Sequence, residues 1–244
     1  MSDWYKEDLA FIHDVGFADF ACNSAPGILE VLERYGISEG LVIDLGCGSG
    51  LLAHELLKHG YHLLGIDISE AMIRIARTRA PGAEFRVESV FKSALPPCGA
   101  VTAISECLSY AFDPDHDERG LDRLFSRVYD ALTPGGVFIF DLVEPGQVEP
   151  GAVYRGFTEG EDWVVLVEKH EDLARRLLTR RIITFRKEGD RYRRDAEVHQ
   201  QHLCNPEHVA EMLGVLGFQV HVERSYGGYA LPIARVAFVA RKPA

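Results

Sequence analysis

The sequence predicts an α/β fold built around a parallel sheet, and three observations support this. Apolar runs with strand-like composition, such as "LVIDLG" and "HLLGIDI", alternate with helix-like segments through the first 145 residues. That rhythm is typical of βαβ units. A glycine-rich turn, "GCGSG", follows the first run. A chain of 244 residues, 47% hydrophobic, can also bury the core of one large domain that carries an insertion.

The core elements follow in order along the chain. Two helices are predicted between early strands, in "GLLAHELLKHG" and "SEAMIRIARTRA". Pro134 and the pair Gly135-Gly136 cannot continue the helix before them, so the fifth strand should begin near Val137. The predicted strands occupy residues 41–46, 62–68, 83–89, 100–106 and 136–142.

The character of the sequence changes between residues 147 and 202. Long runs such as "WVVLVEKHED" alternate polar and apolar residues and are rich in β-branched and charged side chains, which predicts an insertion of two or three antiparallel strands. A helix should follow, with Asn205 as its N-cap, Pro206 at its first position and its end at Gly217. The last two runs, "FQVHVERSY" and "IARVAFVAR", are joined by "GGYALP" and predict a hairpin at one edge of the main sheet.

Composition excludes several classes of function. The formal charge of −11 argues against a protein that wraps a nucleic-acid backbone, and suits small or cationic substrates better. The charged start and the lack of an apolar run near 20 residues predict a cytoplasmic protein with no membrane partner. The five cysteines form no C-x-x-C pair, so we expect neither a disulfide framework nor a zinc site, and no metal.

The glycine turn and two acids indicate which ligand the fold binds. A dinucleotide fingerprint would read G-x-G-x-x-G, whereas here Leu51 stands at the position of the last glycine. Asp44, just before the turn, would repel a pyrophosphate but suits the ammonium and sulfonium groups of S-adenosylmethionine. Asp67 ends the second strand, where it can accept hydrogen bonds from ribose hydroxyls, and Ile68 can lie against an adenine face.

With these residues the chain resembles the class I S-adenosylmethionine-dependent methyltransferases over residues 38–145. Motif I matches Asp44 to Gly50, and the acidic motif II matches Asp67. The resemblance implies a Rossmann-like sheet of seven strands with the last one antiparallel, and S-adenosylmethionine as the cofactor. It also implies a set of cofactor-binding residues: Asp44, Gly46, Cys47, Gly48, Gly50, Asp67, Ile68, Ser69, Met72, Val90 and Ser105.

The chain departs from the family pattern after the third strand. An acid that contacts the adenine amino group would stand where the chain has Ser89, and a shift of one residue would bring Glu88 there instead. The N-terminal segment resembles the lead-in helices of uncharacterised bacterial members, which fold over the cofactor. Tyr5 and His13 are its candidate contacts with cofactor or substrate, although its apolar residues also fit a plain packing stripe.

The loop after the fourth strand, "ISECLSYAFD", should border the reactive methyl group by the same resemblance. Glu106 is the candidate catalytic residue, as a general base or as a ligand for a cationic amine; the alternative is a structural salt bridge. The loop lacks the N/D-P-P-Y/F sequence of base-methylating enzymes, which disfavours nucleic acid as the acceptor. Asp141-Leu142 replaces the Asp-Asn pair of magnesium-assisted O-methyltransferases, which disfavours that route.

The sequence therefore predicts methyl transfer from S-adenosylmethionine to an oxygen or nitrogen of a small molecule. Methylation of protein or RNA, and a cofactor-binding sensor without turnover, are the alternatives. We expect a helical lid over residues 1–37, a cofactor-binding core over 38–146, an insertion over 147–202, and a helix and hairpin over 203–244 that complete the sheet. The insertion would roof the acceptor pocket or form the contact of a homodimer.

Overall fold

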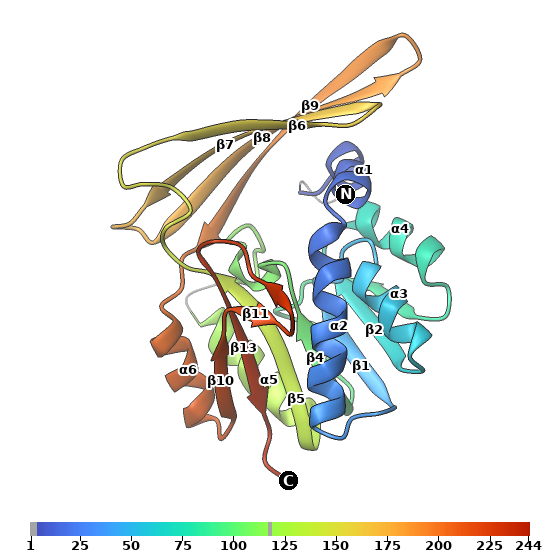
Figure 1. The fold of residues 1–244 in the computed structure, drawn as a ribbon, viewed down its shortest axis with the longest axis vertical. Helices are drawn as coiled ribbons and strands as arrows, with labels where there is room; N and C mark the ends of the chain where they lie inside the picture. Colours follow the sequence, from blue (N-terminus) through green and yellow to red (C-terminus); the bar gives the residue numbers. More distant parts are fainter. Residues whose placement is uncertain (1–3, 117–118) are drawn as a thin grey trace.

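The computed structural model describes residues 4–116 and 119–244, and it has two parts: an α/β core and a separate four-stranded sheet (Figure 1). The helices of the core and its N-terminal extension are α1 (Glu7–Gly16), α2 (Asp19–Arg34), α3 (Leu51–Lys58), α4 (Glu70–Arg79), α5 (Gly120–Ala131) and α6 (Pro206–Val215), with a short 3₁₀ helix η1 (Cys107–Ser109). The strands of the core sheet are β1 (Leu41–Leu45), β2 (His62–Asp67), β3 (Glu84–Val87), β4 (Cys98–Ala103), β5 (Leu132–Val143), β10 (Gln219–Glu223) and β13 (Arg235–Arg241).

The core sheet has seven strands in the order β10-β13-β5-β4-β1-β2-β3. Strands β5, β4, β1, β2 and β3 are parallel to one another, whereas β13 is antiparallel to both β5 and β10. The last strand is thus antiparallel, and the predicted fold is confirmed. The predicted edge hairpin of β10 and β13 is also confirmed, with a small ribbon of β11 (Ser225–Tyr226) and β12 (Tyr229–Ala230) between them.

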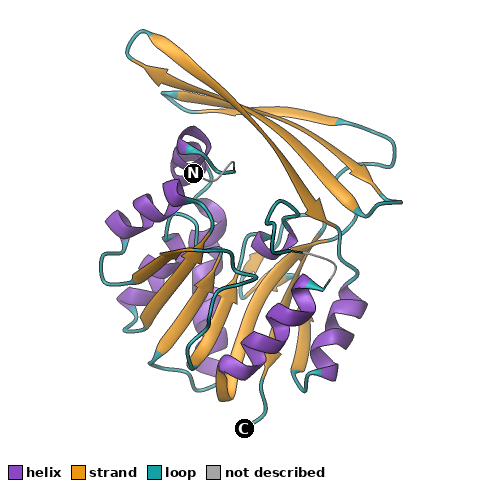
Figure 2. Cartoon of the chain, turned by 180° about the vertical axis from the view of Figure 1, so that it is seen from behind, coloured by secondary structure: helices purple, strands orange, loops and turns teal. Residues whose placement is uncertain are grey.

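Helices cover both faces of this sheet because side chains alternate along each strand. On β5, Val137 and Ile139 pack with residues of α2, α3 and α4, while Phe138 and Phe140 pack with residues of α5 and α6. The two helical layers are visible on either side of the strands in Figure 2. Burial on both faces explains why the strand sequences read as nearly continuous apolar runs.

Strand β5 begins earlier than expected, at Leu132 instead of near Val137. Cys98 pairs with Leu132 and Ala100 pairs with Val137, so three extra residues of β5 are accommodated by a shift in register. Gly135 has φ +83° at this irregularity, a conformation that glycine adopts without strain. The Pro-Gly-Gly sequence therefore bulges the strand instead of preceding it.

The insertion forms four antiparallel strands, not two or three: β6 (Tyr154–Glu159), β7 (Trp163–Asp172), β8 (Leu177–Glu188) and β9 (Arg191–His202). Strand β6 was missed because its side chains are mostly exposed and it has no apolar face, so only its pairing with β7 identifies it. This sheet lies above the carboxyl ends of the parallel strands and beside α1 (Figure 1).

Helix α6 follows the insertion and begins as predicted. The side chain of Asn205 accepts hydrogen bonds from the backbone N–H groups of Glu207 and His208, at 2.9 and 3.3 Å. Gly217, with φ +100°, follows its end. Across residues 4–116 and 119–244, none of the helices combines the length and apolar character that crossing a membrane would require.

Candidate active site

The glycine turn joins β1 to α3, and each of its glycines has a positive φ. The values are +66° at Gly46, +52° at Gly48 and +76° at Gly50, in the region that L side chains rarely adopt. A Cβ at Gly46 would collide with the side chain of Cys107, whereas a Cβ at Gly48 would meet no atom within 4 Å. Gly46 is therefore required by packing, and Gly48 presents bare backbone to an open cavity.

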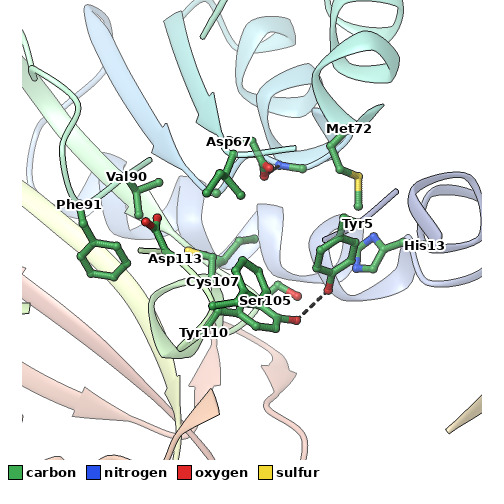
Figure 3. Close-up of a pocket in the computed structure, with 15 residues that line it drawn as sticks. Tyr5, His13, Asp67, Met72, Val90, Phe91, Ser105, Cys107, Tyr110 and Asp113 are labelled. Carbon is green, nitrogen blue, oxygen red and sulfur yellow. Dashed lines mark hydrogen bonds between the residues drawn. The ribbon is translucent and has the colours of Figure 1, made fainter. Parts of the chain in front are cut away.

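Asp67, at the end of β2, ties this turn to the start of α4. Its carboxylate accepts the N–H of Gly48 at 2.9 Å and the N–H of Ser69 at 2.8 Å. Each carboxylate oxygen can accept a further hydrogen bond. Asp67, Ile68 and Met72 line the cavity that Figure 3 shows, so the structure brings these three predicted residues together.

Ser69 supports the cavity from outside. Its hydroxyl accepts the N–H of Met72 at 3.2 Å, as the N-cap of α4, and donates to the carbonyl of Tyr5 at 2.8 Å. Ser69 is buried and is not among the lining residues. It therefore fixes the position of Tyr5 and of α4.

Asp44 lies behind the glycine turn, with its side chain buried. It accepts a hydrogen bond from the hydroxyl of Thr102 at 2.7 Å. Burial raises the pKa of Asp44 to about 7, and the negative charge of Asp67 adds to the rise. Together with Cys47, His13 and Ser105 it lines a smaller cavity that shares Gly46 and Gly48 with the one in Figure 3. A cationic group in that space would favour the ionised carboxylate.

The opposite end of the cavity is lined by Asp113, a residue that sequence analysis did not single out. Ser89 donates its hydroxyl to Asp113 at 2.7 Å, and it is Asp113, with Val90 and Phe91, that lines the cavity (Figure 3). Glu88 accepts a hydrogen bond from Ser93 and lines a different cavity. The acid at this end of the cavity thus comes from the loop after β4, and no local pattern in the sequence links Asp113 to Ser89.

Tyr5 and His13 reach the cavity from α1 and the segment before it. The hydroxyl of Tyr5 is 2.7 Å from that of Tyr110, a second residue that sequence analysis did not single out (Figure 3). Burial raises the pKa of both hydroxyls and lowers the pKa of His13 to about 4. At neutral pH, His13 is therefore uncharged, and its Nδ1 is buried without a hydrogen-bond partner among residues 4–116 and 119–244.

A second cavity, of about 370 Å³, lies against the first and shares four of its residues: Tyr5, His13, Ser105 and Tyr110. The insertion contributes side chains from β7 and β8 to it, and α1 and the loop before β13 contribute others. The insertion is held there by α1, since Leu9 and Ile12 form a buried cluster with Trp163, Val165 and Ile182. The insertion therefore closes a space beside the first cavity.

Glu106 lies in this second cavity, 2% exposed, and its carboxylate is already engaged. It accepts hydrogen bonds from Arg180 at 2.8 Å, from Gln201 at 2.9 Å, and from Arg235. A carboxylate paired with two guanidinium groups is a poor proton acceptor. This geometry favours the salt-bridge interpretation of Glu106 over the general base, and its three partners were not predicted.

Asp141 holds the loop that carries Glu106. It is fully buried at the end of β5 and accepts the N–H groups of Ser105 and Glu106 at 2.8 and 2.6 Å, and the hydroxyl of Tyr226 at 3.0 Å. Ser105 and Glu106 have φ values of +64° and +61°, so this strained turn depends on those bonds. Over the part of the chain that the structure describes, no group of three His, Cys, Asp or Glu residues could hold a metal ion.

Comparisons with known proteins find similarity to methyltransferases. Residues 42–136 match the family described as "Methyltransferase domain". A trans-aconitate 2-methyltransferase of Variovorax paradoxus is 30% identical over 153 residues, which cover 61% of this chain and 56% of that protein.

Solved structures share the fold over nearly the whole chain. An S-adenosylmethionine-dependent methyltransferase from Clostridium acetobutylicum superposes with a TM-score of 0.80 at 20% identity, covering 98% of this chain and 99% of the other. The sugar N-methyltransferase KedS8 from Streptoalloteichus gives a TM-score of 0.79 at 21% identity, covering 100% and 96%. The likeness includes the insertion as well as the core sheet.

Proposed function

We propose that this chain is a class I S-adenosylmethionine-dependent methyltransferase, and that it moves the methyl group to an oxygen or nitrogen of a small-molecule acceptor. One observation carries the proposal: the cofactor cavity and the larger cavity beside it share Tyr5, His13, Ser105 and Tyr110. A molecule in each cavity would meet at that shared wall. S-adenosylmethionine, when bound, supplies a methyl group already activated by a positively charged sulfur.

The residues present fit this cofactor. Gly48 leaves open space with its backbone exposed to the cavity, and Asp67 retains acceptor capacity beyond its two backbone bonds. Asp67 would hold the ribose hydroxyls, and Asp44 the ammonium end. Asp113, fixed by Ser89, would accept a hydrogen bond from the adenine amino group, between the apolar side chains of Val90 and Phe91.

The chain contributes positioning more than proton transfer. Holding two reacting groups in line can supply roughly 7 to 11 kcal/mol of the barrier. His13 is uncharged at neutral pH, and its Nδ1, which has no partner among the described residues, can accept a hydrogen bond from the hydroxyl or amine of the acceptor. The paired hydroxyls of Tyr5 and Tyr110 stay protonated and close the wall between the two cavities. We assign Glu106 the role of orienting Arg180 and Arg235.

Contacts of the insertion favour a small acceptor over protein or RNA. Three of its arginines form ion pairs within the chain: Arg180 with Glu106, and Arg186 and Arg193 with the buried carboxylate of Asp8. Arginines that neutralise internal acids contribute little to a basic surface for a polyanion.

Two measurements test the proposal. Calorimetric titration should show binding of S-adenosylmethionine and S-adenosylhomocysteine but not of NADH. Mass spectrometry of metabolite panels incubated with protein and cofactor should then show products heavier by one methyl group. Tight cofactor binding without any methylated product across broad panels would favour the sensor, and methylation confined to protein or RNA would contradict the small acceptor.

A further inference from the structure

The second cavity, in which the proposed function places the acceptor and which we call the acceptor cavity, contains a cluster of cations. The chain as a whole has a net charge of −11. Lys169 of β7, Arg180 of β8 and Arg235 at the start of β13 all line it, against the carboxylates of Glu106 and of Asp19 at the exposed mouth. At neutral pH these side chains sum to one positive charge. The sign of this cavity is thus opposite to that of the molecule as a whole.

The two arginines have donors that the protein leaves unused. A guanidinium group carries five N–H donors, and here both groups share the single carboxylate of Glu106. Arg180 Nε and Arg235 Nη1 are buried, and neither has a hydrogen-bond partner in the described part of the chain. Buried donors of this kind cost free energy unless a ligand satisfies them. Their planar forks match the two oxygens of a carboxylate or phosphate.

Lys169 adds a cation that is not neutralised. Its ammonium group is 3.4 Å from the side-chain oxygen of Gln147 and 5.6 Å from the ring of Tyr154, and it forms no ion pair with any described residue. Burial and the nearby charge of Arg180 lower its pKa to about 8. Lys169 therefore remains mostly protonated at pH 7, although its surroundings disfavour the charge.

The remaining walls of the cavity are apolar and aromatic. Leu9, Phe17, Phe20, Val165 and Ile182 line it, so an acceptor would present a hydrocarbon body to them. We propose that the acceptor is an amphipathic small molecule with a carboxylate or phosphate group, and that Lys169, Arg180 and Arg235 bind this oxyanion. The inference rests on the proposed function, because it places the methylated atom of the same molecule at the wall formed by Tyr5, His13 and Ser105.

The test uses four compounds that share a benzene ring and differ in charge: benzoate, phenyl phosphate, benzamide and benzylamine. Each is titrated calorimetrically into the full-length protein saturated with S-adenosylhomocysteine. We expect one or both anions to bind at least about tenfold tighter than benzamide, and benzylamine to bind most weakly. The ratio of the two anions tells a carboxylate site from a phosphate site.

Two variants and a matched control locate the site. Arg180→Met and Lys169→Met should each weaken anion binding about tenfold while their affinity for S-adenosylhomocysteine stays near wild type, which also reports that they fold. Arg181→Met removes the same charge from the neighbouring, exposed position of β8, which does not line the cavity, and should change anion binding by less than about twofold.

Three results would overturn the inference while leaving the proposed function intact. They are equal binding of benzamide and the anions, an effect of Arg181→Met as large as that of Arg180→Met, and binding of none of the four compounds to a protein that holds S-adenosylhomocysteine. Failure of the wild-type protein to bind S-adenosylhomocysteine would instead overturn the proposed function, and the inference with it.

Discussion

The carboxylate of Asp67 holds the glycine turn in place by accepting the N–H of Gly48, and it also lines the cofactor cavity. Asp67→Ala should therefore lose most of the affinity for S-adenosylmethionine, since hydrogen bonds to a charged group are worth roughly 1.5 to 3 kcal/mol each. Calorimetric titration measures the loss. Glu70→Ala, which removes an exposed acid three residues later, is the control and should bind normally. Equal loss in both variants would contradict a specific role for Asp67.

Asp44 should make cofactor binding depend on pH. In the free protein its pKa is about 7, because burial and Asp67 oppose its ionisation more than the hydroxyl of Thr102 favours it. A bound cation favours the ionised form, so binding releases a proton at acidic pH. Affinity should be nearly constant above pH 7 and fall by up to about tenfold per unit below it. Titrations between pH 5 and 8 measure this, and a flat profile would show that no cation binds next to Asp44.

The two interpretations of Glu106 predict different results for Glu106→Gln. A general base predicts turnover lowered by roughly a hundredfold with stability unchanged. The ion pairs with Arg180 and Arg235 predict a less stable protein, because removing one partner of a buried pair typically costs about 3 to 5 kcal/mol. Denaturant unfolding and cofactor titration of the same variant distinguish them. We expect the loss of stability.

At the level of elements, the sequence predicted what is locally encoded. The strands of the core, the cap at Asn205 and the residues around Asp67 carry their own signals in periodicity, capping chemistry and glycine placement. Strand β6 and the cations of the acceptor cavity carry none, because they depend on pairing and on contacts between distant segments. Asp113 illustrates the limit, since it lies 24 positions from Ser89 and is linked to it only through space.

The contact between α1 and the insertion is another long-range feature with a testable consequence. The carboxylate of Glu197, on β9, accepts the N–H groups of Tyr5 and Lys6 at 2.7 and 3.0 Å, and so anchors the start of α1. A negative charge there also stabilises α1, because it interacts favourably with the positive N-terminal end of the helix dipole. Glu197→Gln should speed amide hydrogen exchange in α1 and weaken cofactor binding several-fold.

Hydrogen exchange followed by mass spectrometry measures that change. Glu168→Gln provides the control: it removes a carboxylate from β7 of the same sheet, where Glu168 forms an ion pair with the exposed side chain of Arg155. Unaltered exchange of residues 7–16 in Glu197→Gln would show that the apolar cluster of Leu9 and Ile12 holds the helix by itself.

On the scale of the whole molecule, the net charge differs in sign from the charge of the cavity in which we place the acceptor. The charge of −11 favoured small or cationic substrates, whereas the cavity beside the cofactor site is lined by Lys169, Arg180 and Arg235 from three strands. An average over 244 residues is dominated by the solvated surface, whereas a ligand meets only the side chains that line its cavity. Those side chains come together only when the insertion folds over the core.

Removing the insertion therefore tests whether the core alone binds the cofactor and whether the insertion is needed for methyl transfer. Cys204 donates its N–H to the carbonyl of Val143 at 2.8 Å, so the chain leaves and re-enters the core at adjacent points and a short Gly-Ser linker can replace residues 151–200. The core sheet has its own buried clusters on both faces and should still fold.

We expect this variant to bind S-adenosylmethionine more weakly, because Glu197 no longer anchors Tyr5, and to methylate nothing. Light scattering should give the same assembly state as the intact chain; a dimer that becomes a monomer would show that the exposed apolar side chains of the insertion, among them Phe157, serve assembly.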